Sequence, residues 1–322
     1  MKLGINYLFE SMYPFKSLLE IRKDLEEMRK YGFEGIRITG NGSWPLKIAR
    51  EAKRTGLQVW LCPRFVHSEP ELGTREYLEK MKEFAEAAEK ENIDVFLVGN
   101  ELGVEIRDFA EIQGYENRCE NWQRFENEFR QRENIFREYL TSLAKEAKKF
   151  FSGPVTYAAG TWELDSINWS EFDIVSANLY LWKGFAEKQY EETLEKLKKH
   201  GKPVVITEFG FTSTKEAWEI GPRHIYGMRE FPLSIRNFLV FHPKIVRRTL
   251  KLNPRILLKT KIPHHYDEKT QERLMQRNLQ ILTKAGVTYA FVHQWSEPWK
   301  ASFGLTHNGI PKKALSLFPL KP

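Results

Sequence analysis

The chain has 322 residues, of which 41% are hydrophobic and 29% are charged, a composition that fits a globular protein with a sizeable buried core. No segment approaches the run of about 20 uncharged apolar residues that a membrane span needs, so we expect a soluble protein. The formal net charge is +7, and the richness in Lys and Glu resembles the composition of thermophilic proteins. Cys62 and Cys119 stand in no CxxC or Cys/His spacing, so neither a disulfide framework nor a zinc site is predicted. Met1 and Lys2 run straight into an apolar strand pattern, so we expect no signal peptide and a cytoplasmic location.

Short apolar runs typical of buried strands alternate along the chain with amphipathic stretches of helical period. Eight strands are predicted, at residues 3–7, 35–39, 58–63, 95–98, 155–159, 174–179, 204–207 and 289–293. Most of these runs are apolar at successive positions, which is typical of parallel strands that are covered on both faces. The sequence therefore predicts an α/β protein with a single (β/α)8 TIM barrel that spans residues 1–322 as one domain. An open doubly wound sheet is the alternative, but no glycine-rich phosphate loop follows the first strand.

Amphipathic helices are predicted between most of these strands. They are expected at residues 17–31, 44–54, 75–91, 117–151 and 267–285. The helix before the seventh strand is expected to end at residues 198–203, where basic residues precede a glycine cap and a proline. Residues 160–173, between the fifth and sixth strands, are too few for a full helix and two loops, so only a turn or two of helix is expected there.

The loops after the fourth and the seventh strands are enlarged. The second of these insertions, residues 212–266, contains eleven Lys or Arg and three acidic residues, so its net charge is +8 and the rest of the chain carries about −1. Its many large apolar side chains make it a basic amphipathic segment, which can pack on the barrel or lie on an anionic surface such as a membrane or an acidic sugar. We expect the packing role, as a lid or as a contact between two copies of the chain, with Arg247, Arg248 and Lys251 facing solvent or an anionic partner. No nucleic-acid-binding pattern accompanies the charge, so nucleic-acid binding is not predicted.

Two of the predicted strands lead directly into a glutamate. Glu101 follows the apolar run 95–100, and Glu208 follows the run 203–207. A carboxylate at the end of a buried strand is held by rigid backbone, and active sites of barrels lie at the carboxyl ends of the strands. Two carboxylates on one face are what acid/base and nucleophilic chemistry on a glycosidic bond requires. Both enlarged loops follow one of these glutamates, so we expect the loops to wall the cleft.

The surroundings of the two glutamates resemble those in the clan A glycoside hydrolases, barrel enzymes with their catalytic glutamates at the ends of strands four and seven. The strand count places Glu101 on strand four and Glu208 on strand seven. The segments that carry the resemblance are Gly35-Ile36-Arg37-Ile38-Thr39, Asn100-Glu101, Asn178-Leu179-Tyr180, Thr207-Glu208-Phe209-Gly210, Val292-His293-Gln294-Trp295 and the tail from Phe303 to Leu315. The end of strand three, at Arg64, lacks the histidine that several of these families carry, and the 212–266 insertion matches no one family, so no specific family is assigned.

The resemblance implies a retaining glycosidase that cleaves a β-linked glycoside or oligosaccharide through a glycosyl-enzyme intermediate. Glu101 would be the acid/base and Glu208 the nucleophile, with their carboxyl oxygens about 5 to 5.5 Å apart. The residues that the resemblance and the loop positions assign to substrate binding are Arg37, Asn100, Trp162, Asn178, Tyr180, Trp295 and Trp299. No cofactor or metal is expected, and the predicted partner is a carbohydrate.

Each of these residues is expected to act in its own way. Arg37 and the strand-six Tyr180 would contact the nucleophile, and Asn100 would donate to the sugar 2-hydroxyl. Trp295 would lie under the sugar ring, whereas Trp162 and Trp299, in loops after strands, would line sugar subsites.

Two other functions remain open at the level of the sequence. A metal-dependent sugar isomerase or epimerase on the same barrel also uses strand-end glutamates, but it needs a further Asp or His cluster as metal ligands. A non-catalytic barrel that binds carbohydrate or a protein partner would leave the function to the insertion. His293 is predicted to be a hydrogen-bonded structural histidine, and Glu163 and Glu297 to be solvated loop carboxylates.

Overall fold

The fold is that of a computed structural model of the chain. The structure describes residues 1–8, 16–65, 69, 72–113, 115–223, 265–297, 301–307, 309–318 and 320. Trp299 and residues 224–264, which make up most of the 212–266 insertion, lie outside the described residues. Among the described residues, no helix combines the length and the apolar composition that crossing a bilayer would require.

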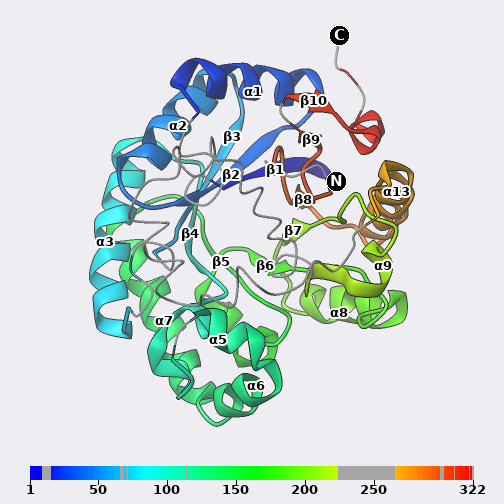
Figure 1. The fold of residues 1–322 in the computed structure, drawn as a ribbon. Coiled ribbons are helices and arrows are strands. Elements are labelled where there is room, and N and C mark those ends of the chain that lie inside the picture. The colour runs from blue at the N-terminus through cyan, green and yellow to red at the C-terminus, as the bar shows by residue number, and fades with distance from the viewer. Residues whose placement is uncertain are drawn as a thin grey trace, which may run out of the picture.

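Eight parallel strands form a barrel surrounded by helices (Figure 1). The strands are β1 (Lys2–Leu8), β2 (Gly35–Gly40), β3 (Gln58–Pro63), β4 (Val95–Asn100), β5 (Val155–Ala158), β6 (Val175–Asn178), β7 (Val204–Phe209) and β8 (Tyr289–Val292). Their order in the sheet is β5-β4-β3-β2-β1-β8-β7-β6. A parallel bridge between Ala159 and Ala177 joins the two end strands and closes the ring. The predicted eight strands and (β/α)8 fold are therefore confirmed.

The helices cover the outside of the strands. The long ones are α1 (Leu18–Lys30), α2 (Ser43–Arg54), α3 (Thr74–Lys90), α7 (Glu133–Phe150), α8 (Glu187–Lys198) and α13 (Glu268–Lys284). A capping box in which Ser17 and Glu20 bond to each other's backbone starts α1. Between β5 and β6 lie only the short 3-10 turns η2 (Leu164–Ser166) and η3 (Trp169–Glu171), as predicted for this short unit.

The helical stretch predicted at residues 117–151 is present but divided. It consists of α5 (Tyr115–Glu120), α6 (Trp122–Arg130) and α7. The breaks fall at Asn121 and Arg132, whose backbones leave the helical region with φ of −110° and −113°. Dividing the stretch lets α6 and α7 turn Phe129 and Phe136 toward each other, with ring centroids 4.9 Å apart. Packing of these two buried rings therefore prevails over the formation of one continuous helix.

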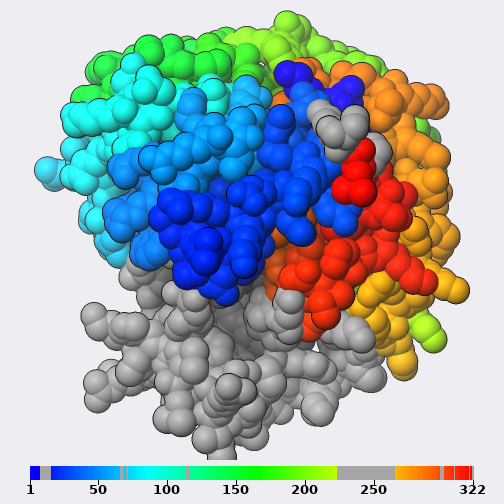
Figure 2. Space-filling model, turned by 90° about the horizontal axis from the view of Figure 1, so that it is seen from above, coloured from blue at the N-terminus to red at the C-terminus, as the bar shows by residue number. Residues whose placement is uncertain are grey.

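The remaining short elements lie after β4, after β7 and at the end of the chain. They are α4 (Leu102–Glu105), η1 (Arg107–Phe109), α9 (Ala217–Ile220), η4 (Gly221–Arg223), β9 (Thr306–His307), β10 (Ile310–Pro311) and η6 (Lys313–Leu317). Figure 2 shows the last of these, in red, beside the blue first helical unit. There the rings of Phe33 and Phe318 pack with centroids 4.8 Å apart.

Aromatic side chains fill the barrel interior near the amino ends of the strands. The ring centroid of Phe291 lies 4.8 Å from that of Tyr289 and 5.0 Å from that of Trp60. A Cβ on Gly4 would lie 2.4 Å from the ring of Phe291, so only glycine leaves room for this ring on β1. The resulting apolar floor closes the barrel, and the polar residues described next lie toward the carboxyl ends of the strands.

Candidate active site

Glu208 lies near the end of β7 and is surrounded by groups that favour its ionised form. Arg37 Nη1 donates to its Oε1 at 2.7 Å, and the Tyr180 hydroxyl donates to its Oε2 at 2.8 Å. His293 Nδ1 lies 3.6 Å from the same Oε2. Burial alone would raise the pKa of Glu208, but the charges of His293 and Arg37 and the hydrogen bonds from Arg37 and Tyr180 outweigh it and lower that pKa below its ordinary value.

Arg37 is held in place from several strands. It is fully buried in β2, opposite Asn6 in the register of β1, and its Nη1 donates to Asn6 Oδ1 at 2.9 Å. Its Nη2 donates to Asn100 Oδ1 at 2.5 Å. A buried guanidinium needs such acceptors and a counter-charge, and Glu208 supplies the charge. Arg37 therefore ties the ends of β1, β4 and β7 together.

Glu101 follows β4 and has few stabilising partners for a charge. Asn178 Nδ2 donates to its Oε1 at 2.9 Å. Burial of the carboxyl, followed by the negative charge of Glu208, raises the pKa of Glu101 to about 7. This carboxyl is thus suited to carry a proton near neutral pH, whereas Glu208 is suited to stay ionised.

A network of amides connects the two glutamates. Asn178 Nδ2 also donates to Asn100 Oδ1 at 3.1 Å, and Thr207 Oγ1 donates to Asn178 Oδ1 at 2.8 Å. Since Asn100 accepts from Arg37 as well, hydrogen bonds run from Glu208 through Arg37, Asn100 and Asn178 to Glu101. Glu101 and Glu208, which are 107 residues apart in the chain, therefore belong to one site at the carboxyl ends of the strands.

Within the part of the chain that the structure describes, no group of three or more His, Cys, Asp or Glu is arranged to hold a metal ion.

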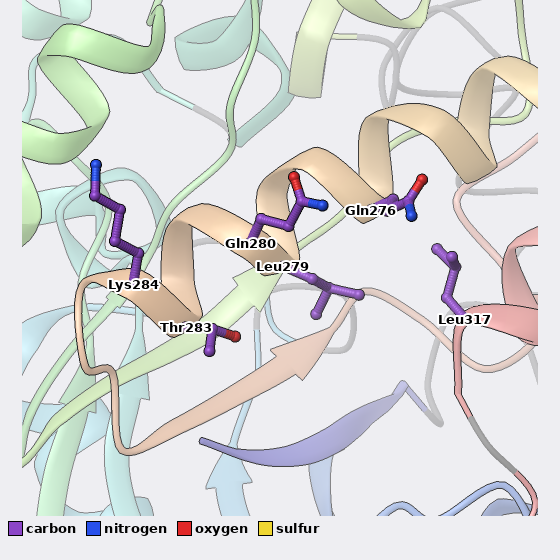
Figure 3. A pocket seen from close by; sticks show the side chains of 6 residues that line it. All are labelled: Gln276, Leu279, Gln280, Thr283, Lys284 and Leu317. Carbon is purple, nitrogen blue, oxygen red and sulfur yellow. The ribbon is translucent and has the colours of Figure 1, made fainter.

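A hollow of about 530 Å³ lies away from the strand ends, on the outer face of α13 beside η6 (Figure 3). Leu279 and Leu317 contribute its apolar wall, and no strand-end residue lines it. This hollow is therefore separate from the two glutamates.

Several solved structures share this fold at low sequence identity. A GH113 β-1,4-mannanase is similar with a TM-score of 0.65 and 14% identity, covering 99% of this chain and 98% of that one. A GH113 β-mannanase from Alicyclobacillus acidocaldarius, in complex with ManMIm, has a TM-score of 0.62 and 13% identity, covering 98% of this chain and 95% of that one. The Bacteroides uniformis β-glucuronidase 2, covalently bound to cyclophellitol-6-carboxylate aziridine, has a TM-score of 0.64 and 14% identity, covering 99% of this chain and 34% of that one. No protein-family model matches the chain, and no curated protein matches it in sequence.

The chain has the barrel fold of these glycoside hydrolases. The resemblance to the clan A barrels that the strand-end motifs indicated is thus confirmed for the fold. The structure also brings together the predicted site residues Arg37, Asn100, Asn178 and Tyr180 around the two glutamates.

Trp295 is not brought to this site, which corrects the prediction of a sugar-stacking aromatic. Its ring is 1% exposed and packs 6.4 Å from Tyr31 and 6.3 Å from Phe33, centroid to centroid, at the connection between α1 and β2. The backbone leaves the strand after Val292, so Trp295 turns into the layer between strands and helices. Trp162 is partly exposed beside Trp122, with ring centroids 4.7 Å apart.

Three residues have a different environment from the one that the sequence predicted. His293 contacts the nucleophile candidate, and its Nδ1 has no hydrogen-bond partner among the described residues. Tyr289 and Phe291 face the barrel interior. Because side chains along a strand alternate between its two faces, the spacing of two residues could have placed His293 inward as well. Glu163 and Glu297 were predicted to be solvated, but they are 0% and 5% exposed and accept hydrogen bonds from backbone N–H groups.

Proposed function

We propose that this protein is a retaining glycoside hydrolase that cleaves a β-linked glycoside or oligosaccharide, with Glu101 as acid/base and Glu208 as nucleophile. The observation that carries the proposal is the opposite direction of the two pKa shifts within one hydrogen-bonded site, upward to about 7 for Glu101 and downward for Glu208. Double displacement at an anomeric carbon needs one protonated carboxyl and one ionised carboxylate.

In the first step, a carboxylate oxygen of Glu208 attacks the anomeric carbon while the proton of Glu101 moves to the glycosidic oxygen. That oxygen leaves with the bonding electron pair, and the sugar becomes an ester of Glu208. In the second step, ionised Glu101 takes a proton from water, the water oxygen attacks the same carbon, and Glu208 leaves as a carboxylate. Arg37 and Tyr180, which each donate to one oxygen of Glu208, stabilise the charge that returns to it.

Asn100 is the residue we assign to recognition of the sugar 2-hydroxyl. Its Oδ1 accepts hydrogen bonds from Arg37 and Asn178, which fixes the orientation of the amide. The Nδ2 group remains as its donor, next to Glu101 in the chain. Hydrogen bonds to the 2-hydroxyl strengthen in the oxocarbenium-like transition state, so a fixed donor at this point favours the reaction.

The names of the structural neighbours suggest where to begin the substrate screen. β-1,4-manno-oligosaccharides, aryl β-mannosides and aryl β-glucuronides come first, and aryl β-glucosides follow. We expect release of sugar that is insensitive to a chelator, with the product first appearing as the β-anomer by proton NMR. First appearance of the α-anomer would contradict retention, and activity that requires a divalent ion would favour an isomerase or epimerase instead. Binding of these sugars without turnover would favour a non-catalytic barrel.

A further inference from the structure

Glu163 has a buried carboxyl group close to Glu101 that the proposed reaction does not use. Its side chain is 0% exposed, although it lies in the loop after β5. The backbone N–H of Gly103 donates to its Oε1 at 2.8 Å. The N–H of Gly160 and the hydroxyl of Tyr157 donate to its Oε2 at 2.8 and 2.9 Å. Both oxygens of Glu163 face donors, whereas an amide at this position would turn its own N–H groups toward some of them.

Tyr157 extends this network to the residue next to Glu101. While its hydroxyl donates to Glu163, the same oxygen accepts the backbone N–H of Leu102 at 2.6 Å. Leu102 and Gly103 are the first two residues of α4, and N–H groups at the start of a helix have no partner within the helix. The start of α4 is therefore capped by side chains from β5 and the loop that follows it.

This capping from outside relieves Glu101 of that role. Glu101 occupies the N-cap position of α4 but makes no capping hydrogen bond with its side chain. Its backbone has φ of 47° and ψ of 45°, in the left-handed region that non-glycine residues rarely adopt, so the surroundings must hold it there. The carboxyl is instead bonded to Asn178 within the site.

We infer that Glu163 and Tyr157 are positioning residues for the acid/base: they cap α4 in place of Glu101 and thereby keep the Glu101 carboxyl in the site. The contact is close, since a Cβ on Gly103 would lie 2.8 Å from Glu163 Oε1 and 2.7 Å from the ring of Phe129. Burial and the negative charge of Glu101 raise the pKa of Glu163 to about 8, although the hydrogen bonds from Gly160, Gly103 and Tyr157 act in the opposite direction. The inference rests on the proposed function, because it assumes that Glu101 donates the proton.

The test compares aryl β-glycosides whose leaving phenols span a wide range of acidity. In Glu163→Gln and Tyr157→Phe, kcat/KM for poor leaving groups should fall roughly ten- to a hundredfold, while 2,4-dinitrophenyl glycosides are nearly unaffected. The dependence of rate on leaving-group pKa should steepen in the same sense as in Glu101→Ala. A merely structural role would lower the rate for all leaving groups alike. Tyr157→Phe removes a single oxygen atom and serves if Glu163→Gln does not fold.

Two matched variants control for the loss of a buried hydrogen bond. Glu297→Gln alters a buried carboxylate that accepts from the N–H of Gly304, and Tyr7→Phe removes a buried hydroxyl that donates to Asp24. Both should keep the leaving-group dependence of the unmodified protein. An unchanged dependence in Glu163→Gln and Tyr157→Phe, with Glu101→Ala dependent on the leaving group, overturns this inference alone. If Glu101→Ala itself shows no such dependence, the proposed function and this inference fall together.

Discussion

At the scale of single residues, the two glutamates differ because their neighbours differ. Glu208 faces the guanidinium of Arg37, the hydroxyl of Tyr180 and the ring of His293. Glu101 has a neutral amide as its hydrogen-bond partner and feels the negative charge of Glu208. The same side chain is therefore suited to two roles, one as a proton donor and one as a carboxylate.

The first prediction separates these roles by mutation. Glu208→Ala should abolish turnover of every glycoside, because no covalent intermediate can form. Glu101→Ala should keep activity on 2,4-dinitrophenyl glycosides, whose phenolate leaves without a proton, and azide should accelerate it by replacing water in the second step. Initial rates with and without azide measure both effects. Equal responses of the two variants to azide and to the leaving group would show that the roles are assigned wrongly.

The second prediction concerns pH. Activity needs ionised Glu208 and protonated Glu101, so kcat/KM should be bell-shaped, with its alkaline limb near pH 7 and its acidic limb below the ordinary glutamate pKa of 4.5. His293 lowers the pKa of Glu208, so His293→Phe should raise that pKa and move the acidic limb to higher pH. The alkaline limb should stay in place. The exposed His200, after α8, provides the control variant His200→Phe. An acidic limb that does not move in His293→Phe would show that His293 does not lower the pKa of Glu208.

At the scale of elements, the strand ends determine which side chains reach the site. β6 and β7 pair so that Asn178 lies opposite Glu208, and β1 and β2 pair so that Asn6 lies opposite Arg37. After β8 the chain leaves the sheet, and the site receives His293 while Trp295 enters the layer between strands and helices. The path of residues 293–295 thus determines that Trp295 packs in the core instead of contacting the site.

The third prediction follows from the place of Trp295. Trp295→Ala should lower the free energy of unfolding by about 3 to 5 kcal/mol, because it removes a large buried ring that packs against Tyr31 and Phe33. Below the unfolding transition, KM and kcat per folded molecule should change little. Urea unfolding and Michaelis kinetics on the same preparation measure the two effects. A large rise in KM with unchanged stability would restore Trp295 as a residue that contacts the sugar.

The sequence predicts the strands and both glutamates because these depend on local pattern. Apolar runs that lead into Glu101 and Glu208 suffice to place both residues at the carboxyl ends of parallel strands. The buried state of Glu163 does not follow from its local sequence, since one of its donors, the N–H of Gly103, comes from the unit that follows β4. In the same way, the division of the 117–151 stretch depends on where aromatic side chains find partners in space.

At the scale of the whole molecule, the basic insertion leaves and rejoins the barrel at one point. Thr214 and Tyr266 form an antiparallel bridge, Lys215 N–H donates to His265 O at 2.9 Å, and Asp267 N–H donates to Ser213 O at 2.9 Å. The two ends of the insertion therefore meet directly after β7, on the side of the barrel that holds Glu208. Joining ends that already lie together costs little chain entropy.

The fourth prediction uses this geometry. Replacing residues 224–264 by a short Gly-Ser linker removes nine Lys or Arg and one acidic residue, which changes the formal net charge from +7 to −1. The barrel should still unfold cooperatively. If the insertion is a lid, its removal should raise KM. If it joins two copies of the chain, its removal should lower the mass at sedimentation equilibrium. With a packing role, the unmodified protein should not bind phosphatidylserine vesicles even at low salt. Vesicle binding that weakens steeply toward physiological salt, and is lost with the insertion, would instead identify an anionic surface as its partner.

Trapping the covalent intermediate and mapping it tests directly whether Glu208 is the nucleophile. The protein is incubated with cyclophellitol aziridines of manno, gluco and glucuronic configuration, digested with trypsin and analysed by mass spectrometry. Because trypsin does not cleave before Pro203, peptide 200–215 is released with Glu208 as its only acidic side chain, so its mass alone identifies the labelled residue. We predict an adduct on Glu208 that is absent from Glu208→Ala. An adduct on Glu101, or glycoside turnover by Glu208→Ala, would contradict this prediction.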